Sequence, residues 1–293
     1  MVAEATTPDV FHMLGPWWLL AAVAACLPIS AAVFWRVGRW WITAEPVPPP
    51  LDRDAPPAPW RDAVGVGLFI GMQVLAMGLA AGYGAAADAG LLPWEPIDIP
   101  PEFSPGVFLA QVLPPLVGLA VVLAYGRRGL AAAGVRAGRV ASGILHGLVT
   151  FATILPACVA ALVVSISAMQ LLRAPVSSHP LITVLREAPA VWMMVAGVVQ
   201  AVVLAPLVEE FMYRGVLLGS LVRPVGVVGA LVGSSAVFAM VHLPTEPQAV
   251  PPLFILGMAL GYAAYRTRSL VAPVLAHALF NALMIFGTLW SGD

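Results

Sequence analysis

Lysine is absent from this 293-residue chain, and charged residues of every kind make up only 10% of it. All 14 basic residues are arginine, and 15 acidic residues bring the formal net charge to −1. Because no basic run is present, we expect no nucleic-acid partner. Both cysteines, Cys26 and Cys158, lie inside apolar stretches, so neither a disulfide framework nor a CxxC metal site can be built from them.

Apolar residues, in contrast, are abundant. They account for 60% of the chain, and the mean hydropathy is +0.93. The few charges are bunched between long apolar runs, which is typical of a protein embedded in a bilayer. We therefore predict an all-α, polytopic transmembrane helix bundle. Abundant Ala, Gly and Pro, with arginine in place of lysine, indicate a GC-rich genome and hence a bacterial source. We therefore expect a multi-pass protein of the bacterial inner (cytoplasmic) membrane.

Eight stretches are candidates for crossing the membrane, because a spanning helix needs about 20 largely apolar residues. The fifth of them continues through a charged turn as far as Leu221. The eight are Leu14–Trp35, Ala63–Ala86, Gly106–Gly126, Val140–Leu172, Ala190–Leu207, Val225–His242, Pro252–Tyr265 and Leu270–Leu289.

Arginine is unevenly distributed among the connecting loops. The segment after the first span and the loop between the third and fourth spans each hold four arginines, whereas the loops at 87–105 and 243–251 hold none. Positively charged loops stay in the cytoplasm. The distribution therefore predicts that both termini lie outside it.

The chain divides into three predicted parts. Residues 1–61 form an N-terminal transmembrane helix followed by a cytoplasmic linker, Pro46–Pro59, whose proline content prevents helix formation. Residues 62–189 hold the second to fourth spans. Residues 190–290 hold the last four spans and almost all of the ionisable residues that interrupt apolar runs, so we expect the functional site there.

Two adjacent carboxylates, Glu209 and Glu210, interrupt the fifth span. Glu210 and Arg214 are i, i+4 neighbours on one helix face, so we predict that they pair. Glu209 points about 100° away and has no partner on its own helix. Pro206 lacks an N–H and is able to kink the helix or open it to water just before the pair. The alternative is that the two carboxylates merely cap the cytoplasmic end of a helix.

Histidines stand on two further spans. His242 ends the sixth span, one turn after Phe238, and taken alone it fits a solvated or structural residue. His277 and Asn281 on the eighth span are again i, i+4, so both side chains project from one stripe of an apolar helix. We expect them to share a polar partner.

The ordered set EExxxR, FxxxH and HxxxN resembles the CPBP (CAAX protease, or ABI) family of intramembrane endopeptidases over about residues 190–290. The resemblance implies that Glu209 and His242 hold and activate a water, and that His277 and Asn281 stabilise the oxyanion. It also implies that Glu210 and Arg214 support the site. The expected substrate is a membrane protein or peptide cleaved near the membrane.

A metal is a separate question. The chain has no HExxH motif, which excludes a zincin-type helix. Two histidines and a glutamate are sufficient in number to bind a divalent metal such as zinc. We favour glutamate-dependent hydrolysis without a tightly bound metal.

Three rival functions stand beside the protease. Intramembrane Glu, Arg and His also build ion pathways in transporters, and a family member can act as a scaffold or immunity factor without turnover. A rhomboid-like dyad of Ser234 or Ser235 with His277 is a third rival. It leaves both glutamates unexplained, and small serines within spans usually serve helix packing.

Overall fold

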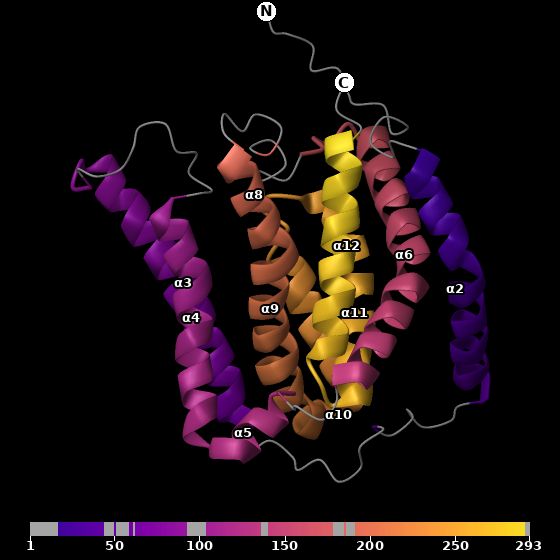
Figure 1. Ribbon diagram of the computed structural model, residues 1–293, viewed down its shortest axis with the longest axis horizontal. Helices are drawn as coiled ribbons and strands as arrows, with labels where there is room; N and C mark the ends of the chain where they lie inside the picture. The colour runs from indigo at the N-terminus through magenta and orange to yellow at the C-terminus, as the bar shows by residue number, and fades with distance from the viewer. Residues whose placement is uncertain are drawn as a thin grey trace, which may run out of the picture.

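The computed structural model describes residues 17–43, 62–92, 104–135, 140–177 and 191–290, together with positions 50, 59, 60 and 185. Most of the predicted linker Pro46–Pro59 therefore lies outside the described residues. All regular structure in the described ranges is helical (Figure 1), so the predicted all-α class is confirmed. The first five helices are α2 (Trp17–Thr43), α3 (Asp62–Asp88), α4 (Pro105–Ala124), the short α5 (Gly126–Ala132) and α6 (Val140–Leu171).

The remaining helices belong to the predicted core, where one long helix changes its hydrogen-bonding pattern several times. It begins as α8 and passes through a π-helix, η3, a short α9 and a second π-helix, η4. The elements in order are α8 (Val191–Val199), η3 (Gln200–Leu204), α9 (Ala205–Glu210), η4 (Phe211–Leu218), α10 (Gly219–Met240), the 3₁₀ turn η5 (Pro247–Ala249), α11 (Val250–Thr267) and α12 (Val271–Trp290).

A single glycine separates the fifth span from the sixth. Gly226 has φ 73° and ψ 172°, a conformation almost confined to glycine, and Pro224 precedes it. The chain folds back there, because Leu231 packs in a cluster with Leu218. Each of the eight predicted spans thus corresponds to one helical arm. Five helices of the described residues are long and apolar enough to cross a membrane, and the 50-residue helix Val191–Met240 that Gly226 divides counts as one of them.

The helices pack in two groups around the core. α6 contacts α11 and α12 and carries α2 on its outer side, whereas α3 and α4 pair with each other and contact η4 and α10. Figure 1 shows these two groups on opposite sides of the α8–α9 arm. Segment 62–189 thus contributes helices to both groups, and the predicted division of the chain into three parts stays a prediction.

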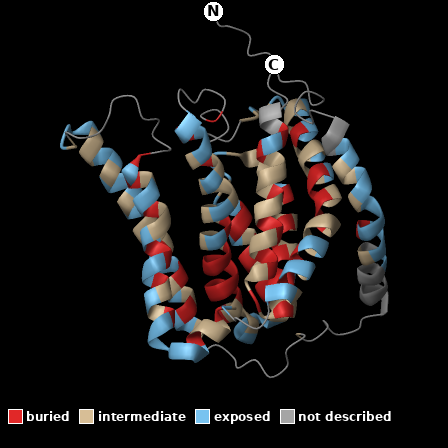
Figure 2. Cartoon of the chain, viewed as in Figure 1, coloured by how far each residue is buried: buried red, intermediate tan, exposed pale blue. Residues whose placement is uncertain are grey.

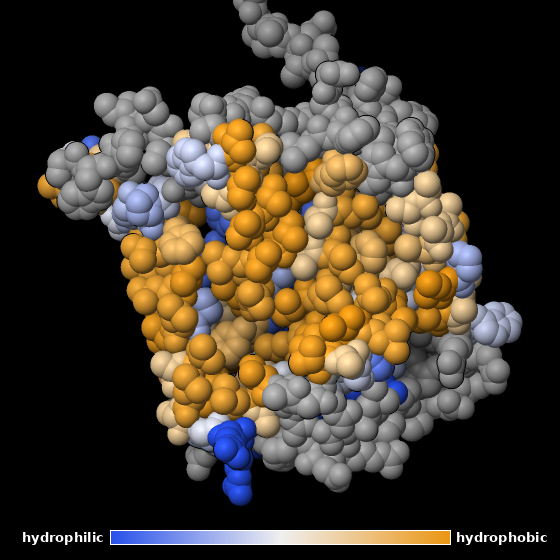
Figure 3. All heavy atoms as spheres, in the orientation of Figure 1, coloured by the Kyte–Doolittle hydropathy of each residue, from blue (hydrophilic) through white to orange (hydrophobic). Residues whose placement is uncertain are grey.

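The surface of the bundle is apolar. Large hydrophobic side chains are exposed along α3, α4, α6 and α8, and Figure 3 shows them covering most of one face. Buried residues concentrate in the central helices (Figure 2). An apolar exterior with several long apolar helices is the arrangement of a multi-pass integral membrane protein.

Of the described arginines outside the site, most lie at one end of the bundle, which we call the arginine end. It comprises α5, the start of α10 and the turn between α11 and α12, all at the lower edge of Figure 1. The described arginines there are Arg127, Arg128, Arg223, Arg266 and Arg268. The alternation of the loops agrees with the predicted topology, and the side of the membrane stays a prediction.

At the opposite end, the loop 241–249 is fastened to the segment after α6. Ser177 donates to the carbonyl of Thr245, and Gln248 donates to the carbonyl of Ser177. Glu246 in this loop lies outside the candidate spans, and burial raises its pKa from 4.5 to about 7.

This burial predicts a dependence of stability on pH. The folded state holds a proton on Glu246 more tightly than the unfolded state, so the stabilisation is complete below about pH 4.5 and is lost as pH rises through about 7. We expect the Tm to fall between pH 5 and pH 8. In Glu246→Gln, which cannot titrate, this part of the fall disappears. Thermal unfolding in detergent at several pH values measures both, and an unchanged slope in the variant would contradict the prediction.

Candidate active site

The helix that carries the two glutamates is a π-helix on either side of them. In η3 the N–H of Ala205 bonds to the carbonyl of Gln200, five residues earlier. The next bond in this pattern would join residue 206 to Ala201, but Pro206 has no N–H. Asn281 of α12 fills this place, because its Nδ2 donates to the Ala201 oxygen at 2.9 Å. Asn281 therefore holds α12 against the irregular turn just before the carboxylates.

This substitution of a side chain for a backbone donor is testable by a double-mutant cycle. Asn281→Ala leaves the Ala201 carbonyl without its donor and is expected to destabilise the protein by about 1 kcal/mol. In a Pro206→Ala background a backbone N–H becomes available, so the same substitution should cost measurably less. Denaturant or thermal unfolding of the four proteins gives the coupling energy. Equal costs in both backgrounds would show that Pro206 does not create the requirement for Asn281.

Glu210 is the most enclosed charge of the site, with no exposed surface. Its Oε1 accepts from Arg214 NH1 at 2.9 Å and lies 2.9 Å from His277 Nδ1. The predicted pair between Glu210 and Arg214 is confirmed. Arg214 NH2 also donates to the carbonyl of Gly257 on α11 at 3.3 Å. The alternative of a charged helix cap is wrong, because this pair is buried in the interior of a continuous helix.

Phe238 organises the groups around the pair. Its ring lies 4.5 Å from the Arg214 guanidinium carbon, a cation–π contact. The same ring meets the rings of His242 and His277 edge-on, with centroids at 5.5 and 5.7 Å. Tyr213 packs against it from the other side at 5.2 Å. One fully buried aromatic residue thus sets the positions of a cation and of both predicted histidines.

Glu209 lies beside this cluster but reaches the surface. Its side chain is 27% exposed, and its Oε2 lies 3.8 Å from His277 Nε2, which is longer than a hydrogen bond. As predicted, it has no partner on its own helix. His277 therefore stands between the two carboxylates, with Nδ1 on Glu210 and Nε2 facing Glu209. A partly exposed carboxylate next to a buried, fixed one is suited to exchanging a proton with water.

The protons of the two histidines follow from their partners. Nδ1 of His242 lies 2.9 Å from the carbonyl of Phe238, and a carbonyl only accepts, so Nδ1 carries the hydrogen. A neutral His242 then presents Nε2 as an acceptor. Nδ1 of His277 likewise donates to the Glu210 carboxylate. When His277 also carries a proton on Nε2, the charges of Glu209, Glu210, Arg214 and His277 sum to zero.

The structure does not bring every predicted residue together. Within the described residues, no hydrogen bond or ion pair joins His242 to Glu209; only Phe238 connects His242 to the cluster. His277 and Asn281 contact the same long helix but different groups on it, rather than one shared partner. The roles of all six residues in catalysis stay predictions.

The serine alternative finds no support in the described contacts. Ser234 donates to the carbonyl of Leu231 on its own helix. Ser235 is buried where α10 approaches Gly257, and a Cβ at that glycine would lie 3.0 Å from the Ser235 Cβ. Both positions fit the close helix packing that small residues allow.

Zinc is not matched by the side chains as they are arranged. Among the described residues, no three His, Cys, Asp or Glu side chains converge in a way that could hold a metal ion. Glu210 Oε1 is already engaged by Arg214 and His277, and His277 Nδ1 is engaged by Glu210. We therefore derive no step through a metal.

Several residues that shape the site carry no charge and were not found from the sequence. Gln73 of α3 donates to the Tyr213 hydroxyl at 3.3 Å, and Gln200 of η3 donates to Gln111 of α4 at 3.1 Å. These bonds tie the α3–α4 pair to the long helix. A survey of polar rather than only ionisable residues within spans would have found the glutamines.

Comparison with known proteins gives one match. A family model described as type II CAAX prenyl endopeptidase Rce1-like matches residues 190–283, about a third of the chain. A search of curated proteins and a search of solved structures each returned no match. The matched segment contains Glu209, Glu210, Arg214, His242, His277 and Asn281. Residues 190–283 are therefore similar to the Rce1-like type II CAAX prenyl endopeptidases, and this match supports the resemblance to the CAAX protease family that the sequence motifs predicted.

Proposed function

We propose that the protein is an intramembrane endopeptidase that hydrolyses a peptide bond near the membrane, with Glu209 as the base. The observation that carries this proposal is the arrangement of two carboxylates of unequal exposure about His277. Glu210 is closed off by Arg214 and holds the histidine, whereas Glu209 is open to water on the other side of the same ring. The charges are fixed before substrate arrives, as electrostatic catalysis requires.

In the proposed reaction, a water held near Glu209 gives its proton to that carboxylate while its oxygen bonds to the peptide carbonyl carbon. The carbonyl oxygen becomes an oxyanion, and the donor that we assign to it is the Nε2–H that His277 presents when both of its ring nitrogens carry hydrogen. Nε2 of His242, as an acceptor, is able to orient the water. The C–N bond then breaks, and Glu209 returns the proton to the leaving amine. The products are one new carboxylate and one new amine.

Asn281 has a more limited place in this scheme. One amide hydrogen is committed to the Ala201 carbonyl, and the second remains for the oxyanion. We propose that Asn281 acts mainly by fixing the position of α12, and with it His277, relative to the long helix that carries the glutamates. This differs from the sequence-based expectation of a purely oxyanion-binding role.

The test compares the termini of membrane proteins in cells that carry the wild type or Glu209→Gln at equal abundance. New N- and C-termini that depend on Glu209 support the peptidase, and their sequences give its substrates. If no terminus depends on Glu209, the endopeptidase proposal fails, and a scaffold or an ion-coupled transporter takes its place. Chelator treatment of the purified protein addresses the metal. We expect retained activity, and complete loss that zinc restores would overturn the metal-free scheme.

A further inference from the structure

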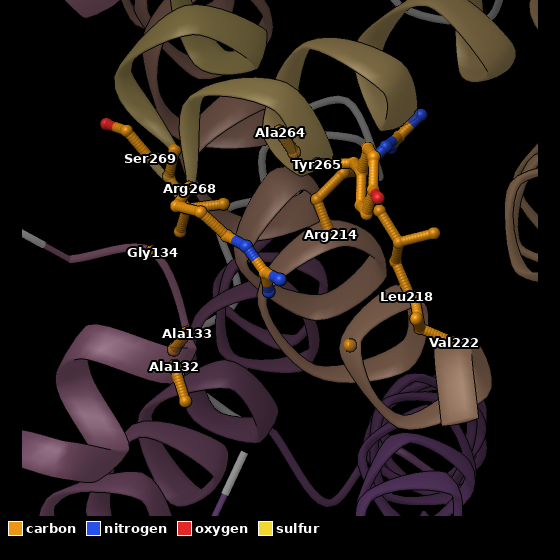
Figure 4. A pocket seen from close by; sticks show the side chains of 12 residues that line it. Ala132, Ala133, Gly134, Arg214, Leu218, Val222, Ala264, Tyr265, Arg268 and Ser269 are labelled. Atoms are coloured by element: carbon orange, nitrogen blue, oxygen red, sulfur yellow. The ribbon is translucent and has the colours of Figure 1, made fainter. Parts of the chain in front are cut away.

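A second arginine faces a pocket on the other side of Arg214 from Glu210. The pocket lies at the arginine end and has a volume of about 390 Å³ including its open mouth. Figure 4 shows the Arg268 side chain extending into the space between Ala133 and Leu218. Small residues leave this space open. The residues that line it include Ala133, Arg214, Leu218, Gly219, Tyr265 and Arg268.

Arg268 occupies a backbone position that normally favours glycine. It caps the end of α11 with φ 52° and ψ 36°, and its N–H bonds to the carbonyl of Ala264. A left-handed residue at this place is usually glycine or asparagine, because a Cβ is disfavoured there. The backbone conformation therefore does not explain why an arginine stands at position 268. The reason must lie in what the arginine side chain does.

The charge of that side chain is not balanced within the described part of the chain. Among the residues that the structure describes, no carboxylate lines the pocket, and Arg268 contacts the Tyr265 ring at 5.7 Å. The charge of Arg214 is taken by Glu210. The guanidinium of Arg268 is therefore the cationic group that reaches into the pocket. A guanidinium that extends into an open space without a carboxylate partner is best satisfied by an anion with several oxygens.

We propose that this pocket binds a phosphate-bearing anion, the headgroup of an anionic phospholipid. Arginine reads phosphate geometry well, and basic pockets between helices at the charged end of a membrane protein bind lipid headgroups. The pocket opens at the arginine end, where the bundle leaves the apolar layer. Its open mouth lets the acyl chains stay outside in the bilayer.

The pocket and the active site share Arg214. The stem of this residue lines the pocket, while its guanidinium holds Glu210 and the Gly257 carbonyl. An anion bound in the pocket therefore holds Arg214 in place, and Arg214 in turn supports Glu210 and His277. The lipid stabilises the folded protein, and this effect does not depend on whether the protein is an enzyme.

The experiment measures the Tm of the full-length protein in neutral detergent during titration with phosphatidylglycerol. Parallel titrations use phosphatidylcholine and inorganic phosphate. We expect a saturable rise with phosphatidylglycerol alone. Arg268→Gly removes the charge and relaxes the left-handed backbone, so the lipid-free protein keeps its Tm while its apparent lipid affinity falls at least about tenfold. Gly219→Leu, which fills open space beside the pocket, should also abolish the rise.

Arg223→Gln is the matched control, because this exposed arginine lies at the same end, pairs with Asp62 and does not line the pocket. In this variant phosphatidylglycerol should raise the Tm as much as it does in the wild type. A rise that survives in Arg268→Gly, or that phosphatidylcholine produces equally, would overturn the proposal and leave Arg268 as a cation at a helix end. An equal rise with inorganic phosphate would overturn the lipid assignment and give the pocket to free phosphate.

Discussion

Glu209→Gln is expected to lower the rate of peptide cleavage by about a thousandfold or more while leaving the Tm nearly unchanged. The amide cannot accept the proton of the attacking water, and general base catalysis typically contributes 10²–10⁴-fold. Stability is spared because the Glu209 side chain is 27% exposed and its Oε2 lies 3.8 Å from His277 Nε2, too far for a hydrogen bond. Rates with a peptide found by terminus mapping, together with thermal unfolding, measure both effects.

Asp62→Asn is the control for this experiment. It removes a carboxylate of similar exposure, at 25%, that pairs with Arg223 away from the site, so cleavage should continue at the wild-type rate. A pronounced loss of Tm in Glu209→Gln would show that the residue is structural. Retained cleavage would show that another group activates the water.

Arg214→Met is expected to have the largest effect on stability. The arginine side chain is 1% exposed and Glu210 is fully buried, so the substitution leaves an uncompensated charge inside the bundle. It also removes the donor to Gly257 and the contact with Phe238. Breaking a buried pair in this way costs about 3–5 kcal/mol. We expect a large fall in Tm and in the yield of folded protein, measured in detergent.

The double variant Glu210→Gln with Arg214→Met separates charge from packing. It removes both charges, and such replacements are often close to neutral, so it should be more stable than Arg214→Met alone. Arg214→Lys keeps the charge but lacks the planar group that bridges Glu210 and Gly257, and it should fall between the two. If the double variant is no more stable than the single one, the arginine matters for its shape rather than for its charge.

The sequence allowed the helical class, the positions of the spans and the Glu210–Arg214 pair to be predicted, because each depends on local periodicity. Apolar length defines a span, and an i, i+4 spacing defines a pair on one face. Gly226 and Pro224 likewise mark the end of the fifth arm within a few residues of the predicted boundary.

The remaining features of the site depend on contacts between distant helices. The carbonyl of Gly257 belongs to a residue without a side chain, so no residue type marks it. The contacts of α12 with η3 and of α10 with η4 join segments that no local pattern relates. The link between Pro206 and Asn281 also required the register of two helices. The sequence does not reveal this link because the two residues are far apart in the chain, although it does show that residue 206 is a proline and lacks an N–H.

The position of His277 and Asn281 on the last helix bears on how the site is made during synthesis. Chains emerge from the ribosome with the N-terminal segments first. The hairpin closed at Gly226 already brings the glutamates, Arg214 and Phe238 together, so a nascent chain inserts its carboxylates with their cation in place. The group that stands between Glu209 and Glu210 arrives only with α12. The proposed active site, if it is built in this order, is complete only when the whole core has been inserted.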